Sequence, residues 1–322
     1  MTAHPLIEPA QGCGEASPQG SVVRPAMLTR AQVREARWPT GVVCPRCGSS
    51  GVQRWCRTRG GGQRYRCRWG CGRTFSDLTG TSLAYTKRFD SWALAAQCMA
   101  SGCSVRETAS RARLSPATAF RWRHRILTTV HGATSRGLLS GIIEIHVLHV
   151  WESFKGSRPP SRPPRRRALR WVERHDRSRH VAAIIARDRR GGRAGLTLGE
   201  VGCVSAGWLA RALEGRIVLP ATICSPYRQG FARYCRRAGI ANECPGGPRH
   251  RSASLSLFHN HGAAAGGRSF SWWLRRFRGI ATKYLQNYLA WHELLEREPG
   301  MSETARRQQL ILTGCIGAPV FS

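Results

Sequence analysis

Two pairs of cysteines near the N-terminus constrain what this chain can fold into more than any other feature. The first pair lies in the motif CPRCG and the second in YRCRWGCGRTF, and a basic, glycine-rich segment separates them. Thiolates at this spacing converge on one cation, and tetrahedral zinc at about 2.3 Å per Zn–S bond is the usual result. A segment this short buries too little apolar surface to fold without a metal. The sequence therefore predicts a zinc ribbon over residues 37–80, with a structural Zn²⁺ held by Cys44, Cys47, Cys67 and Cys71.

The residues around the cysteines support this prediction. Gly48 and Gly72 directly follow the second cysteine of each pair, where the turn requires a positive φ. The second pair has C-x3-C spacing instead of the commoner C-x2-C, which loosens one turn without preventing metal binding. Cys56 is a spare thiol that competes weakly for the same metal. The alternative is a loop with four unpaired thiols, which the spacing disfavours.

The charge of the chain indicates a polyanionic partner. Its 322 residues include 51 Lys and Arg against 18 Asp and Glu, which gives a formal net charge of +33. Such an excess repels itself unless a polyanion shares the surface, so nucleic acid is the expected partner. A GC-rich coding sequence would explain why 48 of the 51 basic residues are arginine, but it does not explain the shortage of acidic residues.

Cysteine usage and hydropathy indicate the compartment. The chain has 13 cysteines, no secretory signal segment and no apolar run near the roughly 18 residues that span a bilayer. We therefore expect a cytoplasmic protein with free thiols and no membrane partner.

Two capped helices joined by a short turn follow the ribbon. Ser104 with Glu107 has the spacing of a capping box, and Ser115 with Pro116 has the pattern of a second helix start. Together with the apolar helical pattern of SWALAAQCMASG, this predicts a helix-turn-helix in residues 81–132, and the alternative is an ordinary basic helical hairpin. The second helix is the candidate recognition helix. Its predicted DNA contacts are Ser115, Thr118 and Arg121 near its start, with Arg123 and Arg125 as phosphate contacts.

The rest of the chain alternates strands and helices. Apolar, β-branched runs predict strands in LLSGIIEIHVLHV, HVAAIIARD and RIVLPATI, and helical patterns appear in SAGWLARALEG and YRQGFARYCRRAG. This order predicts an α/β domain whose mixed sheet is flanked by helices. Residues 243–270 carry little periodic signal, and an aromatic stripe then predicts a long helix from Ser271, interrupted near Gly279.

Three segments lack a packing pattern. Residues 1–36 form an expected disordered leader with one short helix around residues 29–37, and residues 298–322 form an expected tail. A segment rich in proline and arginine, SRPPSRPPRRR, interrupts the α/β pattern and has the composition of a stiff excursion that could follow a phosphate backbone.

The motifs also carry a resemblance to a known family. The order CPRCG, YRCRWGCGRTF, LTGT, RWRHR, GIIE, ESFKGSR, RRR, VAAIIARDRRG and WWLRRFRGIATKYLQNYLAW resembles the zinc-ribbon insertion-sequence transposases of bacteria, over roughly residues 40–295. The resemblance implies that the ribbon and the helix-turn-helix bind the double-stranded DNA of transposon ends in the bacterial nucleoid. It further implies an RNase H-like domain over residues 137–297, with a DDE-type site that cleaves and joins DNA using two Mg²⁺ ions. It does not decide whether the protein forms a homo-oligomer.

The sequence departs from this family at the acidic positions. His146 and Ser225 stand where the family has catalytic aspartates, and GAAAGGRS stands where a polar Asn or His is expected. Beyond residue 137 the only aspartates are Asp176 and Asp188. Glu144 shares a strand face with His146 by the period of two, so a substitute site of Glu144, His146 and Asp188 is conceivable.

Three functions are compatible with this pattern. The first is a catalytically inactive transposase relative that keeps DNA binding. The second is a working DDE-type transposase with substitute ligands, or with paired frameshifts that replaced its aspartates. The third is a zinc-dependent transcription regulator derived from the same scaffold.

Overall fold

A computed structural model describes residues 29–134, 138–155, 180–191, 193–201, 204–226, 229–244, 257–277, 279–296 and 313–314. Most of the expected leader, the segment SRPPSRPPRRR, Asp176 and all of the expected tail except Thr313 and Gly314 lie outside the described residues. The carbonyl of Gly314 accepts a hydrogen bond from the Ser82 hydroxyl, so this point of the tail lies against the N-terminal half of the chain.

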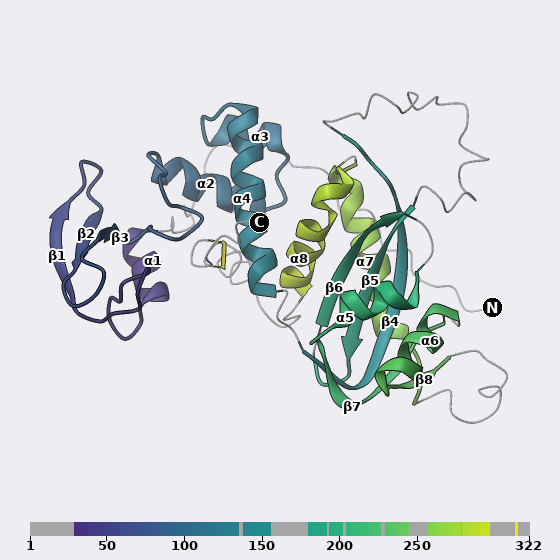
Figure 1. Cartoon of the computed structure of the whole chain (residues 1–322). Coiled ribbons are helices and arrows are strands. Elements are labelled where there is room, and N and C mark those ends of the chain that lie inside the picture. Colours follow the sequence, from purple (N-terminus) through teal and green to yellow (C-terminus); the bar gives the residue numbers. More distant parts are fainter. Residues whose placement is uncertain are drawn as a thin grey trace, which may run out of the picture.

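The N-terminal part combines one helix with a small antiparallel sheet (Figure 1). Its elements are α1 (Arg30–Arg37), β1 (Val52–Arg57), β2 (Gln63–Cys67) and β3 (Thr74–Ser76), with strand order β1-β2-β3. The short helix predicted near residues 29–37 is confirmed, and Thr29 begins it with a capping box to Gln32. Trp38 packs edge-on against Tyr65 and Phe75, which stack with ring centroids 5.4 Å apart. These three rings form a core separate from that of the rest of the chain.

Three helices follow, namely α2 (Phe89–Ala100), α3 (Val105–Arg111) and α4 (Pro116–Thr134). Gly102 has φ +75° and ends α2, as the sequence predicted. The Ser104 hydroxyl accepts a hydrogen bond from the Glu107 N–H and caps α3. A tight turn with Arg113 at φ +51° then leads into α4, whose first residue is Pro116.

The C-terminal part is a mixed α/β arrangement, as predicted. Its strands are β4 (Leu139–Trp151), β5 (His180–Asp188), β6 (Arg193–Val201), β7 (Ile217–Cys224) and β8 (Ala241–Glu243). The sheet order is β6-β5-β4-β7-β8, with β4 antiparallel to β5 and parallel to β7. One face carries α5 (Ala206–Leu213) and α6 (Gln229–Ala238), and the other carries α7 (His261–Leu274) and α8 (Leu285–Glu296) (Figure 1). Short 3-10 turns, η5 (Arg275–Phe277) and η6 (Thr282–Tyr284), connect α7 with α8.

Helix α7 corrects the sequence prediction. The sequence places the start of this helix at Ser271, whereas α7 begins at His261 and includes the whole Gly/Ala run. The glycines allow close approach to the sheet: a Cβ at Gly267 would lie 2.4 Å from Cδ2 of His146, and one at Gly266 would lie 2.5 Å from an Arg187 nitrogen. Tertiary packing thus overrides the low helix propensity of glycine.

The helical and α/β parts share one core. Leu127 and Val130 of α4 belong to the same buried cluster as Leu285 and Tyr288. The predicted boundary between residues 132 and 137 therefore separates two chain segments but not two cores.

Candidate metal centre and nucleic-acid interface

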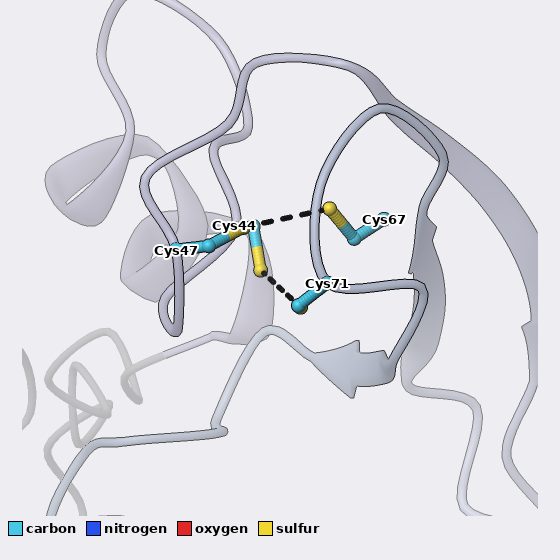
Figure 2. A group of neighbouring side chains, drawn as sticks. All are labelled: Cys44, Cys47, Cys67 and Cys71. Atoms are coloured by element: carbon cyan, nitrogen blue, oxygen red, sulfur yellow. Dashed lines mark hydrogen bonds between the residues drawn. The ribbon is translucent and has the colours of Figure 1, made fainter.

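Four cysteine side chains meet where the loop before β1 approaches the turn after β2 (Figure 2). Their Sγ atoms all lie within 4.8 Å of one another, and the Cys44–Cys71 and Cys47–Cys67 pairs are each 3.6 Å apart. A tetrahedral zinc ion with bonds of about 2.3 Å requires sulfur atoms about 3.8 Å apart. The four residues predicted from the sequence are thus brought together in an arrangement that fits one metal ion such as zinc.

Glycines shape both cysteine turns. Gly48 and Gly72 have φ of +74° and +67°, so each turn has the left-handed residue that the sequence predicted. Gly70 lies in the longer C-x3-C turn, and a Cβ there would lie 2.7 Å from Sγ of Cys47 and 2.9 Å from Sγ of Cys67. The longer turn is therefore compatible with the centre because the residue that lies closest to these sulfur atoms has no side chain.

The electrostatics of this centre favour a thiolate at Cys47, whereas burial and the neighbouring Cys44 and Cys47 thiols raise the pKa of the Cys71 thiol. Hydrogen bonds from the backbone N–H groups of Ser49 and Cys71 lower the pKa of the Cys47 thiol to about 6. Residues 41–76 contain eight arginines and no acidic residue. A positive surrounding stabilises S⁻, which is the form of cysteine that binds a metal.

The first two turns of α4 are largely exposed and carry both polar and apolar side chains. Ser115 and Arg121 are exposed, and Thr118 is half-buried between them. The Ser115 hydroxyl accepts a hydrogen bond from the Thr118 N–H at 3.2 Å, and Arg121 lies 3.4 Å from the Thr118 hydroxyl. This cap holds the predicted base-reading side chains in one patch at the start of the helix.

Arg123 does not have the predicted role of a phosphate contact. Its side chain is only 5% exposed and donates a hydrogen bond to the carbonyl of Cys103 at 2.5 Å. Its guanidinium also lies 6.0 Å from the ring centroids of both Phe277 and Trp291. The prediction was wrong because helical periodicity turns residue 123 toward α8, which the sequence pattern alone does not place beside α4.

Arg125 also has a structural contact. It is half-buried and donates a hydrogen bond to the carbonyl of Ala84 at 2.7 Å, and burial lowers the pKa of its guanidinium. Of the five predicted DNA contacts, the structure groups Ser115, Thr118 and Arg121 on one surface and directs Arg123 and Arg125 into the protein.

Glu144 caps helix α7. Its Oε2 accepts hydrogen bonds from the N–H groups of Gly262 at 2.7 Å and Ala263 at 3.3 Å. Its Oε1 lies 3.0 Å from Nδ1 of His259 and 3.6 Å from Nε of Arg189. The side chain is buried, and both oxygens of the carboxylate are engaged. Glu144 therefore compensates the positive end of α7, whose N-cap residue makes no side-chain cap of its own. Because the Gly/Ala run has little helical signal, the sequence did not predict the start of α7, and the contacts of Glu144 with it were missed.

Asp188 lies on the opposite face of the sheet from Glu144. In the antiparallel register Asp188 pairs with Ile143, whereas Glu144 pairs with Arg187, and directly opposed residues share a face. The Asp188 carboxylate accepts hydrogen bonds from the N–H groups of Ser140 at 2.8 Å and Arg190 at 2.9 Å. The conceivable site of Glu144, His146 and Asp188 is thus wrong, because the strand register separates its two carboxylates.

His146 and Ser225, which stand where the resembled family has aspartates, are half-buried and fully buried respectively. His146 shares a face with Glu144, as predicted, and faces Gly267 of α7. Burial, with a contribution from Arg268, lowers the pKa of the His146 imidazole. Ser225 follows β7, is fully buried, and its N–H donates to the carbonyl of Glu243 at 3.1 Å.

Within the described ranges, the four-cysteine group is the only set of three or more His, Cys, Asp or Glu side chains placed to hold a metal ion. No helix in those ranges is both long and apolar enough to cross a bilayer. Comparisons of this chain with models of protein families, with curated proteins and with solved structures find no match.

Proposed function

We propose that the chain is a DNA-binding protein in the lineage of the zinc-ribbon insertion-sequence transposases. In this proposal the four-cysteine module is a zinc ribbon, α3 and α4 form a helix-turn-helix, and the sheet with its helices is an RNase H-like domain. The protein binds double-stranded DNA at transposon ends and does not cleave or join it.

One observation carries the binding proposal. The start of α4 exposes Ser115, Ala117 and Arg121, whereas most of the helix beyond residue 121 is partly or fully buried, largely against α2, α3 and α8. A helix that is anchored along its length and exposed at its N-terminal turns has the geometry in which recognition helices enter the major groove. Arg121 in such a position can donate two hydrogen bonds to one guanine. The net charge of +33 supplies attraction to phosphates.

The contacts of the acidic residues support the lack of cleavage chemistry. Two divalent cations about 3.5 to 4 Å apart repel each other, and several carboxylates must offset that repulsion. Glu144 is already bound to α7, His259 and Arg189, and Asp188 belongs to the other face of the sheet. Because these residues do not fit a two-metal site, we assign no reaction step to Mg²⁺.

Equilibrium binding tests the first part of the proposal. Arg121→Ala should lower the preference of the full chain for its best duplex over a scrambled duplex by about 1 to 3 kcal/mol, since a base contact is lost. Arg236→Ala is the matched control, because Arg236 is an exposed arginine on α6, outside the proposed surface. Equal discrimination by the wild type and Arg121→Ala would contradict the proposed role of α4.

A cleavage assay tests the second part. The full chain should give no nicked or joined product from a labelled duplex of the DNA flanking its own gene, with either Mg²⁺ or Mn²⁺. Cleavage that requires the divalent cation and disappears in Glu144→Gln would overturn the non-catalytic assignment.

A further inference from the structure

The three-stranded sheet has one buried face and one exposed face. Val52 pairs with Cys67 and Tyr65 pairs with Phe75, so these four side chains share the buried face. Because successive side chains along a strand point to opposite faces, the residues between these lie on the other face, called the outer face here. It carries Gln53, Arg64 and Arg66. The register of β1 shifts between Arg54 and Arg57, and Trp55 is placed on the same face by the contact of its ring with Arg66.

Trp69 covers one end of the outer face. A Cβ at Gly51 would lie 2.5 to 2.6 Å from three carbon atoms of the Trp69 ring, so the ring rests directly against the Gly51 backbone. Gly51 immediately precedes β1, and its carbonyl accepts a hydrogen bond from the Arg68 N–H at 2.7 Å, so the pairing with β2 continues to it. By the alternation of side chains, a side chain at Gly51 would point to the same face as Gln53. Trp69 is nevertheless 84% exposed. The ring is therefore positioned from one side and open on the other.

Trp55 occupies the other end of the same face. It is 52% exposed, and the guanidinium of Arg66 lies 5.0 Å from its ring centroid. Trp55 follows Gly51, against which the Trp69 ring rests, by four residues, which at about 3.3 Å per residue places the two aromatic positions about 13 Å apart. Arg66 is paired with Gln53 and so lies between them.

The charge of this module fits a polyanion. Its eight arginines in residues 41–76 are not balanced by any acidic side chain in that segment. Arg64 and Arg66 are exposed on the outer face itself, and a hydrogen bond from Arg64 to the Thr74 hydroxyl at 2.7 Å orients the first of them. Exposed aromatic rings interleaved with arginines are typical of surfaces on which bases stack while phosphates pair with cations.

We propose that the outer face binds single-stranded DNA, whose unpaired bases stack on Trp69 and Trp55 while its phosphates pair with Arg64 and Arg66. A duplex does not suit this surface, because the faces of its bases are already stacked on one another. The inference goes beyond the duplex binding proposed for α4, since it assigns a second DNA form to a different part of the chain.

The test measures binding of the zinc-loaded full chain to a short fluorescein-labelled oligothymidine by anisotropy. Trp69→Ala and Trp55→Ala should each weaken binding about 5- to 150-fold, because each removes one stacking partner. Trp272→Ala is the matched control: Trp272 is 68% exposed, but on α7, and its loss should leave the affinity unchanged. Gly51→Ala, which displaces the Trp69 ring, should weaken binding in the same direction as Trp69→Ala.

Several outcomes would overturn the inference. Unchanged affinity in Trp69→Ala and Trp55→Ala, or an equal loss in Trp272→Ala, would remove the stacking role. Tighter binding of the matching oligouridine would reassign the surface to RNA, and an equal loss of duplex affinity in Trp69→Ala would make the contact one to duplex DNA. If Trp69→Ala loses its zinc, Trp55→Ala alone decides between these results. The duplex experiment on Arg121 is separate, so either proposal can fail while the other stands.

Discussion

The guanidinium of Arg123 on α4 donates a hydrogen bond to the backbone carbonyl of Cys103, which lies in the turn between α2 and α3. The same side chain lies close to the aromatic rings of Phe277 and Trp291. One buried arginine thus joins the three-helix segment to the helices that cover the sheet. From its charge the sequence predicted a DNA contact at Arg123, whereas its buried position indicates a role in stability.

We predict that Arg123→Ala lowers the free energy of unfolding by about 2 to 4 kcal/mol, because it removes a charged hydrogen bond and leaves a poorly filled space. Arg121→Ala, two residues earlier and exposed, should change it by less than about 0.5 kcal/mol. Urea denaturation of both variants makes the comparison. Equal stabilities would contradict the structural role of Arg123.

We predict that the full chain binds one zinc ion and that Cys67→Ser loses it together with the β1–β3 structure. Structural zinc contributes about 10 to 16 kcal/mol in modules of this kind, so the small core around Trp38 cannot compensate. Cys56→Ser is the control, because Cys56 is exposed and outside the four-sulfur group. Metal analysis and amide spectra check both variants. Zinc retained by Cys67→Ser, or lost by Cys56→Ser, would identify a different ligand set.

Two helical glycines should respond to alanine in opposite directions. Gly267→Ala forces a Cβ to within 2.4 Å of the His146 ring, so we expect destabilisation by about 1 to 3 kcal/mol. A Cβ at Gly207 on α5 would meet no atom within 4 Å, so Gly207→Ala should stabilise by up to about 1 kcal/mol. Thermal unfolding distinguishes them, and stabilisation by Gly267→Ala would show that α7 lies further from the sheet.

His124 should make stability depend on pH. Its ring stacks on Tyr284 with centroids 3.7 Å apart, and both its nitrogens are buried without a hydrogen-bond partner. Burial, then the charges of Arg123 and Lys283, lower the pKa of this imidazole to about 4. Between that value and the ordinary histidine pKa near 6.5, the unfolded chain binds the extra proton, so stability falls as pH decreases from about 6.5 to 4.

His124→Phe keeps the stacking and removes the titration. We expect the loss of stability between pH 7 and pH 4.5 to be smaller in this variant than in the wild type, by at most about 3 kcal/mol. Comparing the two proteins cancels the contributions of zinc release and of other histidines. Parallel pH profiles would show that folding does not lower the pKa of His124.

Much of this structure could be predicted from local sequence signals. The four-cysteine cluster, the short helix after residue 29, the capped helix starts at Ser104 and Ser115, and the strand HVAAIIARD follow from spacing, hydrogen-bonding side chains and β-branched composition. These signals act over a few residues, so a single sequence contains them in full. The mixed sheet followed from the order of its elements.

The remaining features depend on contacts between distant residues. The glycines of α7 disfavour a helix locally, but their missing side chains let α7 pack closely against His146 and Arg187, which lie on distant strands. Arg123 belongs to the interior because α8 lies beside α4. Strand β6 pairs with β5 although its sequence is rich in glycine. The separation of Glu144 from Asp188 depends on strand register, which a single strand does not specify.

Selection of bound sequences from a randomised duplex library tests the central claim, that the exposed start of α4 reads DNA, most directly. The wild type and Arg236→Ala should enrich one common motif, and Arg121→Ala should lose the preference at one position of that motif while it keeps the rest. Failure of the wild type to enrich any motif, or an identical motif from Arg121→Ala, would contradict the account.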